Sequence, residues 1–120
     1  MTTEELIAAY FAAWNEPEAA RRERLLKEIW AEDATYTDPA VHTVGIRELN
    51  EHIDRVFARY PGSRVVMTSR LDAHHGVLRF LWKKTLADGT SLPEGIDFGE
   101  VSAEGKLRRI VGFFGPLARS

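Results

Sequence analysis

The chain has 120 residues, with 16 lysines and arginines against 18 aspartates and glutamates, and no cysteine. This length supports one core and leaves no room for a second catalytic domain, and the lack of cysteine excludes disulfides and thiolate chemistry. A net charge of −2, no apolar run near the roughly 20 residues that span a bilayer and no signal-peptide pattern predict a single cytoplasmic domain over residues 1–120 without nucleic-acid or membrane partners.

The start of the chain predicts a pair of helices. Thr2 and Glu5 have the spacing of a capping box, after which apolar residues recur every three or four positions as far as Asn15. Pro17 is suited to the first turn of a second helix, and we expect that helix to extend to Trp30 on its buried face.

Basic residues cluster in this second helix. They alternate with Glu23 and Glu28 at helical spacing, which is typical of a solvated face with ion pairs. The basic positions to which we assign this role are Arg21, Arg22, Arg24 and Lys27.

A short strand and a third helix follow. Residues 35–37 predict a strand that Pro39 must end, because proline has no amide hydrogen for a sheet and restricts the residue before it. Gly45 then precedes a helical pattern that stops at Pro61-Gly62.

The rest of the chain predicts strands only. Asp88-Gly89 and Glu104-Gly105 are hairpin turn signals, and glycines at 95, 99 and 112 could supply bulges and bends. Three helices followed by a long antiparallel meander indicate an α+β fold. The predicted strands cover residues 64–71, 77–86, 95–101 and 107–114.

Three segments connect the chain to a known family. The run from Trp30 to Pro39, the end of the first helix at Asn15, and Gly95-Ile96-Asp97 together resemble the ketosteroid isomerase-like and SnoaL-like polyketide cyclase branch of the nuclear transport factor 2-like superfamily. The resemblance covers nearly the whole chain. It implies three N-terminal helices packed in the concave face of a curved, mostly antiparallel sheet, a cone-shaped half barrel around a hydrophobic pocket.

The resemblance also implies a proton-transfer site. An aspartate before proline at a strand end, here Asp38, is the base in the isomerases, where a helix-one tyrosine, here Tyr10, donates a hydrogen bond to the enolate oxygen. Asp97 corresponds to an aspartic acid that stays protonated in an apolar site and donates to the same oxygen. Two such donors stabilise negative charge as it forms on the oxygen.

Each of these residues also has a simpler interpretation. Asp38 could make only an Asx turn, and Tyr10 could be an ordinary core aromatic residue. Strand alternation places Asp97 opposite Ile96 and Phe98, which in a plain meander is the solvent side, and a charged, proline-containing segment precedes it.

Other side chains are candidates for substrate binding. Trp14, Tyr36 and Trp82 could form walls of the pocket, and His42 could reach its mouth or lie in solvent. Arg79, among apolar strand residues, could pair with Asp38 or Asp97, or protrude at a sheet edge or dimer contact. The adjacent histidines at 74 and 75 diverge, and no metal-site spacing is present.

These patterns predict an isomerase or cyclase that moves a proton next to a carbonyl of a hydrophobic small molecule, without a cofactor. One alternative is a noncatalytic ligand-binding or dimer-forming domain of the same fold. Another is an enzyme similar to epoxide hydrolase relatives, in which an arginine between two aspartates positions water. We also expect a homodimer, because an open-faced sheet leaves one surface to cover and the family pairs its sheets.

Overall fold

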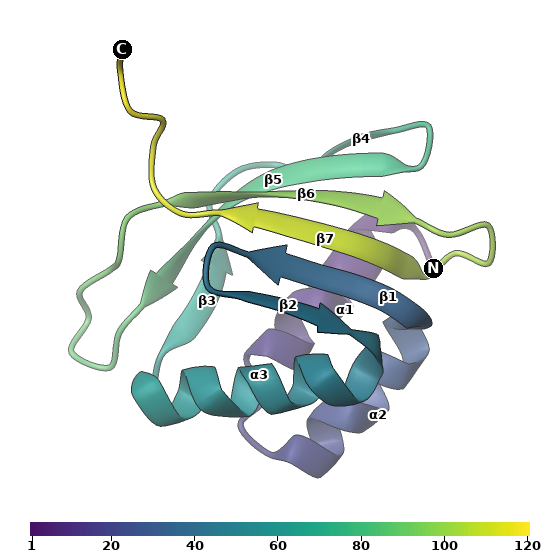
Figure 1. Ribbon diagram of the computed structural model, residues 1–120, viewed down its shortest axis with the longest axis horizontal. Coiled ribbons are helices and arrows are strands. Elements are labelled where there is room, and N and C mark those ends of the chain that lie inside the picture. Colours follow the sequence, from purple (N-terminus) through teal and green to yellow (C-terminus); the bar gives the residue numbers. More distant parts are fainter.

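The computed structural model describes residues 1–120 and places three helices against one face of a curved, seven-stranded sheet (Figure 1). The strand order is β2-β1-β7-β6-β5-β3, and β4 also pairs with β5. The elements are α1 (Thr3–Trp14), α2 (Ala19–Ile29), β1 (Trp30–Asp38), β2 (Val41–Val44), α3 (Gly45–Arg59), β3 (Arg64–Met67), β4 (Asp72–His74), β5 (Val77–Thr85), β6 (Gly95–Val101) and β7 (Leu107–Phe113).

The predicted fold class is confirmed. All strand pairs are antiparallel except β1 with β7, and the sheet stays open. The parallel pair joins the first strand of the chain to the last. A meander of consecutive hairpins, as the sequence predicted, contains no such pair. None of the helices has both the length and the hydropathy that a helix needs to cross a lipid bilayer.

The two ends of α1 are held by side chains. Thr2 and Glu5 form the predicted capping box, with Thr2 Oγ1 accepting from the Glu5 amide and the Thr2 amide donating to Glu5 Oε1. At the other end, Asn15 exchanges two hydrogen bonds with the backbone of Val65 in β3, at 2.9 and 2.7 Å. These bonds tie the end of α1 to an edge strand.

The boundaries of the next elements differ from the sequence prediction. The second helix starts at Ala19 rather than at Pro17, and Trp30 is the first residue of β1 rather than the last residue of that helix. A register shift between Trp30 and Thr35 interrupts the alternation of inward and outward side chains from which strands are predicted. The first half of β1 was therefore not predicted. The four-residue strand β2 was also not predicted.

The glycines of the sheet do not form the bulges that the sequence suggested. The register shifts lie in β1 and between Glu100 and Val101, whereas Gly95, Gly99 and Gly112 leave space for neighbouring atoms. An added Cβ at Gly99, for example, would lie 2.7 Å from Ile110 Cδ1. Their role is close packing on the concave face.

The hydrophobic core fills only one end of the concave face. The first half of α1 packs there through Leu6 and Ile7, and α2 and α3 add Leu26 and Leu49, all buried. Toward the other end the same helices and strands carry larger aromatic and polar side chains. A cavity opens at this second end.

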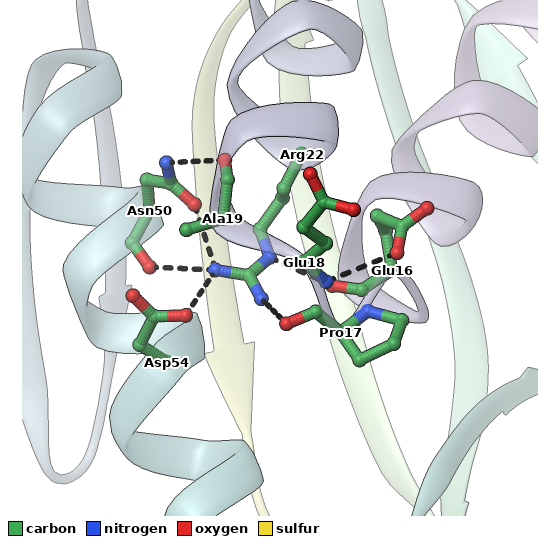
Figure 2. A network of polar contacts seen from close by, with 7 residues as sticks. All are labelled: Glu16, Pro17, Glu18, Ala19, Arg22, Asn50 and Asp54. Carbon is green, nitrogen blue, oxygen red and sulfur yellow. Dashed lines mark hydrogen bonds and ion pairs between the residues drawn. The ribbon is translucent and has the colours of Figure 1, made fainter.

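The prediction that Arg22 lies on a solvated helix face is wrong. Its side chain has 0% exposure, and its guanidinium donates to the carbonyl oxygens of Glu16, Pro17 and Asn50 and to the side chains of Asn50 and Asp54 (Figure 2). It also packs 5.5 Å from the centre of the Phe57 ring. Arg22 therefore joins the α1–α2 loop to α3.

We expect Arg22→Met to lower the free energy of unfolding by about 3 kcal/mol, because it leaves buried carbonyl groups without donors. The matched control is Arg21→Met: Arg21 is exposed and pairs only with Glu18 at 3.2 Å, so we expect a loss below about 0.5 kcal/mol. Urea denaturation at pH 7 measures both. Equal effects of the two substitutions would contradict the assigned role of Arg22.

Candidate functional site

The cavity has a volume of about 710 Å³ and lies between the second half of α1, α3 and the concave face of the sheet. Most of its lining is hydrophobic, and it contains two carboxyl groups. Six of the eight candidate residues line it: Tyr10, Trp14, Tyr36, Asp38, Trp82 and Asp97. Side chains from residue 10 to residue 97 thus meet in one place.

Asp38 ends β1 with its carboxylate in the cavity wall. Oδ1 accepts from the amides of Ala40 and Val41 at 2.8 and 3.1 Å, and Oδ2 accepts from the Tyr36 hydroxyl at 2.7 Å. The Asx turn and the cavity position are therefore both present. Only 5% of the side chain is exposed, and its three donors fix the direction of the carboxylate.

Asp97 points from β6 into the cavity, and its side chain is buried rather than solvent-facing. Oδ1 accepts a 2.8 Å hydrogen bond from Trp82 Nε1. Burial raises the pKa of Asp97 to about 7; the Trp82 bond opposes this shift, and the charge of Asp38 adds to it. Asp97 therefore keeps its proton to a considerably higher pH than a solvent-exposed carboxyl group does.

Two hydrogen-bond donors in the cavity wall have no partner. The Tyr10 hydroxyl and Trp14 Nε1 are buried, and neither makes a hydrogen bond of ordinary geometry, although Trp14 lies close enough to the Tyr10 oxygen to lower the pKa of Tyr10 somewhat. Burial, followed by the charge of Asp97, raises the pKa of Tyr10 well above its ordinary value, so its hydroxyl keeps its proton. Buried polar groups nearly always have partners; Trp30 Nε1 and Thr43 Oγ1 also lack one, but they do not line the cavity. What distinguishes Tyr10 and Trp14 is that they border a space that an acceptor atom could enter.

His52 of α3 was missed by the sequence analysis. Its Nε2 lies 3.8 Å from Asp38 Oδ2, and its ring packs against Trp14 and Tyr36. Burial lowers the pKa of His52, although the charge of Asp38 opposes this effect. The only feature of the sequence that could have indicated His52 is its position beside the apolar stripe of the helix predicted after Gly45.

Two predicted substrate-binding residues lie outside the cavity. Arg79 faces away from it and pairs with Asp72 at 2.8 Å, because it alternates with the inward residues Leu78 and Phe80. His42 is exposed on β2 and contacts Thr37 Oγ1 at 2.7 Å. The prediction of Arg79 and His42 as parts of the site is corrected accordingly.

The same geometry bears on the epoxide hydrolase alternative. No arginine forms an ion pair with Asp38 or Asp97, so the arrangement of an arginine between two aspartates is absent. No group of three or more histidine, aspartate or glutamate side chains is placed to hold a metal ion. The polar side chains that do line the cavity include Tyr10, Asp38, His52 and Asp97, which can exchange protons and form hydrogen bonds.

Comparison with known proteins agrees with this fold. The SnoaL-like domain model matches residues 7–110, and this chain therefore belongs to the SnoaL-like family. A similar solved structure is a proposed isomerase of that family from Agrobacterium tumefaciens, which is 31% identical, with 93% of this chain and 96% of that chain covered and a TM-score of 0.88. No curated protein matches the chain.

More distant structures share the fold alone. An NTF2-like protein of unknown function from Exiguobacterium is 14% identical, with 93% of this chain and 99% of that chain covered and a TM-score of 0.74. A de novo designed protein with a curved β-sheet is 13% identical, with 97% and 89% covered and a TM-score of 0.69. The curved sheet with helices on one face thus forms from very different sequences.

The raised pKa of Asp97 makes stability depend on pH. The unfolded chain releases this proton near pH 4 and the folded chain near pH 7, so the folded state binds more protons between these values. The contribution of Asp97 to the free energy of unfolding should therefore fall as pH rises from about 4 through about 7, by up to about 1.4 kcal/mol per pH unit. Urea denaturation over this range measures the slope.

We expect Asp97→Asn to remove this contribution to the slope. Asp33→Asn is the control, because Asp33 is exposed on β1. A slope that is the same in Asp97→Asn and in the native chain would show that Asp97 ionises like a solvated carboxyl group.

Proposed function

We propose that this protein is an isomerase-like or polyketide cyclase-like enzyme that moves a proton at a carbon next to a carbonyl group of a hydrophobic small molecule. The observation that carries this proposal is the meeting of Asp38, Asp97 and Tyr10 in one largely apolar cavity. The family relationship and the proposed isomerase assignment of a 31% identical relative are consistent with it.

In this proposal Asp38 is the general base. Its Oδ2 atom takes the proton from the carbon beside the carbonyl; the electrons of the C–H bond form a carbon–carbon double bond, and the π electrons of the carbonyl move to its oxygen. The carbonyl re-forms when Asp38 returns the proton to another carbon of the resulting enolate. The backbone donors on Oδ1 keep the carboxylate oriented throughout. His52 and Tyr36 border Oδ2 and would limit the directions from which a substrate carbon can approach.

Tyr10 and Asp97 supply the hydrogen bonds to the oxygen that becomes negative. The Tyr10 hydroxyl has no partner within the chain, and the carboxyl group of Asp97 can donate only while it is protonated. Because Trp82 Nε1 bonds Oδ1 of Asp97, the acidic proton is left for Oδ2. Fixed donors in a site with little water stabilise an enolate more than solvent would.

A second function, noncatalytic binding of a ligand, is favoured by one feature of Asp38. Its carboxylate already accepts three hydrogen bonds, two of them in a turn. A carboxylate in this arrangement can stabilise the β1–β2 turn without taking part in a reaction. The same cavity would then hold a hydrophobic ligand through Tyr10 and Trp14.

Turnover of a β,γ-unsaturated ketosteroid to its conjugated isomer, followed by ultraviolet absorbance, separates these functions. Exchange of α-carbon hydrogens of cyclic ketones in D₂O, followed by NMR, extends the test to other carbonyl compounds. We expect Asp38→Asn to lower the rate at least about 10³-fold and Tyr10→Phe about 10²-fold. The control His42→Gln changes an exposed residue near Asp38 and should retain full activity.

Unchanged activity in Asp38→Asn would overturn the proposed role of the base. An inactive native chain that still binds these ketones would favour the noncatalytic function instead.

We also propose a homodimer formed through the free face of the sheet. The helices cover one face only (Figure 1), and the other carries exposed aromatic residues: Phe98 on β6 is 36% exposed and Phe113 on β7 is 58% exposed. Ile96 pairs with Phe113 and Val111 pairs with Phe98 across these strands, so the exposed residues form one apolar area. Such a patch is typical of a protein interface.

Light scattering should therefore give twice the mass of the chain at micromolar concentration. Phe98→Glu should yield a folded monomer, because burying a carboxylate in this interface is costly. Leu117→Glu changes an exposed apolar residue of the C-terminal segment outside the sheet and should leave the dimer intact. A monomer mass for the native chain would refute this proposal.

A further inference from the structure

Three cationic side chains stand at the rim of the cavity, and the proposed proton transfer uses none of them. Arg55 and Arg59 come from α3 and Lys84 from β5, and all three line the cavity. The arginines are exposed, whereas Lys84 is half-buried. The rim is positively charged, while the buried end of the cavity holds Asp38 and Asp97.

Helix geometry and one aromatic ring bring these cations together. His52, Arg55 and Arg59 follow one another at steps of three and four residues, so they lie along one side of α3. The Arg59 guanidinium carbon lies 5.4 Å from the centre of the Tyr60 ring, and Lys84 Nζ lies 5.8 Å from the same centre. Tyr60 therefore contacts a cation of the helix and a cation of the sheet, and all three residues line the cavity.

None of the three rim cations forms an ion pair with a carboxylate of the chain. The arginines and lysines that do are Arg21, Arg22, Lys27, Arg79 and Arg108. Burial lowers the pKa of Lys84, and the charge of Asp38 opposes this. A partly buried ammonium group without a carboxylate carries a desolvation cost that a bound anion would offset.

We propose that the ligand of this cavity is a ring-bearing carboxylic acid whose carboxylate binds Lys84, Arg55 and Arg59 at the rim. Guanidinium groups match the planar geometry of a carboxylate, and the apolar walls accommodate the rings. In the orientation that rests on the proposed function, a carbonyl group at the other end of the ligand reaches Tyr10 and Asp97. The substrate class is then a hydrophobic keto acid rather than a neutral ketone.

Binding of 2-naphthoate and 2-naphthamide tests this proposal, because the two molecules differ mainly in charge. NMR titration of the protein gives both dissociation constants, and the indole N–H signals of Trp14 and Trp82 report binding inside the cavity. We expect 2-naphthoate to bind about tenfold tighter than the amide. Replacing Lys84, Arg55 and Arg59 together by glutamine should reduce this ratio to about one, with little change for the amide.

The matched controls are Lys83→Gln and Arg47→Gln. Lys83 neighbours Lys84 but points to the other face of β5, and Arg47 lies on α3 away from the cavity, so both variants should keep the tenfold preference. Equal affinities for the two probes in the native chain, a preference that survives in the triple variant, or loss of preference in Lys83→Gln would overturn the proposal.

This measurement needs no turnover, and it therefore separates the two proposals. If Asp38→Asn retains activity while the preference for naphthoate is present, the proposed base is wrong and the anion-binding rim stands. If Asp38→Asn is inactive and the preference is absent, the proton-transfer function stands and the keto-acid class is wrong.

Discussion

The site depends on the burial of the Asp97 carboxyl group in the cavity on the concave face of the sheet. A buried carboxyl group is costly unless it is hydrogen-bonded or neutral, and here it is bonded by Trp82 and its pKa is raised to about 7. Space for this pair comes from two glycines. An added Cβ at Gly112 would lie 2.8 Å from Asp97 Oδ1, and one at Gly95 would lie 2.6 Å from the Trp82 ring. One polar contact thus accounts for residue choices on β5, β6 and β7.

The two aspartates of the cavity differ through their surroundings rather than their chemistry. Asp38 accepts three hydrogen bonds, including two from backbone amides, whereas Asp97 accepts one, from an indole. Since donors favour the charged form of a carboxyl group and burial alone favours the neutral form, Asp97 is the one suited to donate a proton in a hydrogen bond. The proposed function uses this difference, with Asp38 as the base and Asp97 as the donor of a hydrogen bond.

The sequence predicted three helices and the strands β5, β6 and β7 because their signals are local, whereas the strand predicted over residues 64–71 ends at Met67 and β4 was not predicted. The capping box of Thr2 and Glu5 and the turns at Gly89 and Gly105 depend only on nearby residues. The parallel pairing of β1 with β7 and the burial of Arg22 were missed because both depend on partners far along the chain. An arginine among glutamates in a helix has the same local pattern whether it faces water or the carbonyl groups of a loop.

The site shows the same limit. Asp38, Tyr10 and Asp97 were found through the family resemblance, and alternation alone could not decide the direction of Asp97, because it gives two faces without saying which is concave. Arg79 was placed wrongly for a related reason: a charge among apolar residues on a strand suggests an inward function, yet its neighbours Leu78 and Phe80 are the inward residues. The cations of the rim gave no signal, since Arg55 and Arg59 look like ordinary surface residues of an amphipathic helix.

The buried Arg22 network connects the core to the rim of the cavity. Arg22 bonds Asn50 and Asp54 of α3, and these residues flank His52, which borders Asp38, and precede Arg55. A helix held in this way against the α1–α2 loop cannot slide along the sheet without breaking buried hydrogen bonds, which are expensive to lose. A contact outside the cavity thus helps to hold the cations of α3 in place relative to the carboxyl groups on the sheet. The same fold forms from very different sequences, and its curved sheet supplies the cavity. Contacts such as those of Arg22 then determine which side chains face the cavity of a particular protein.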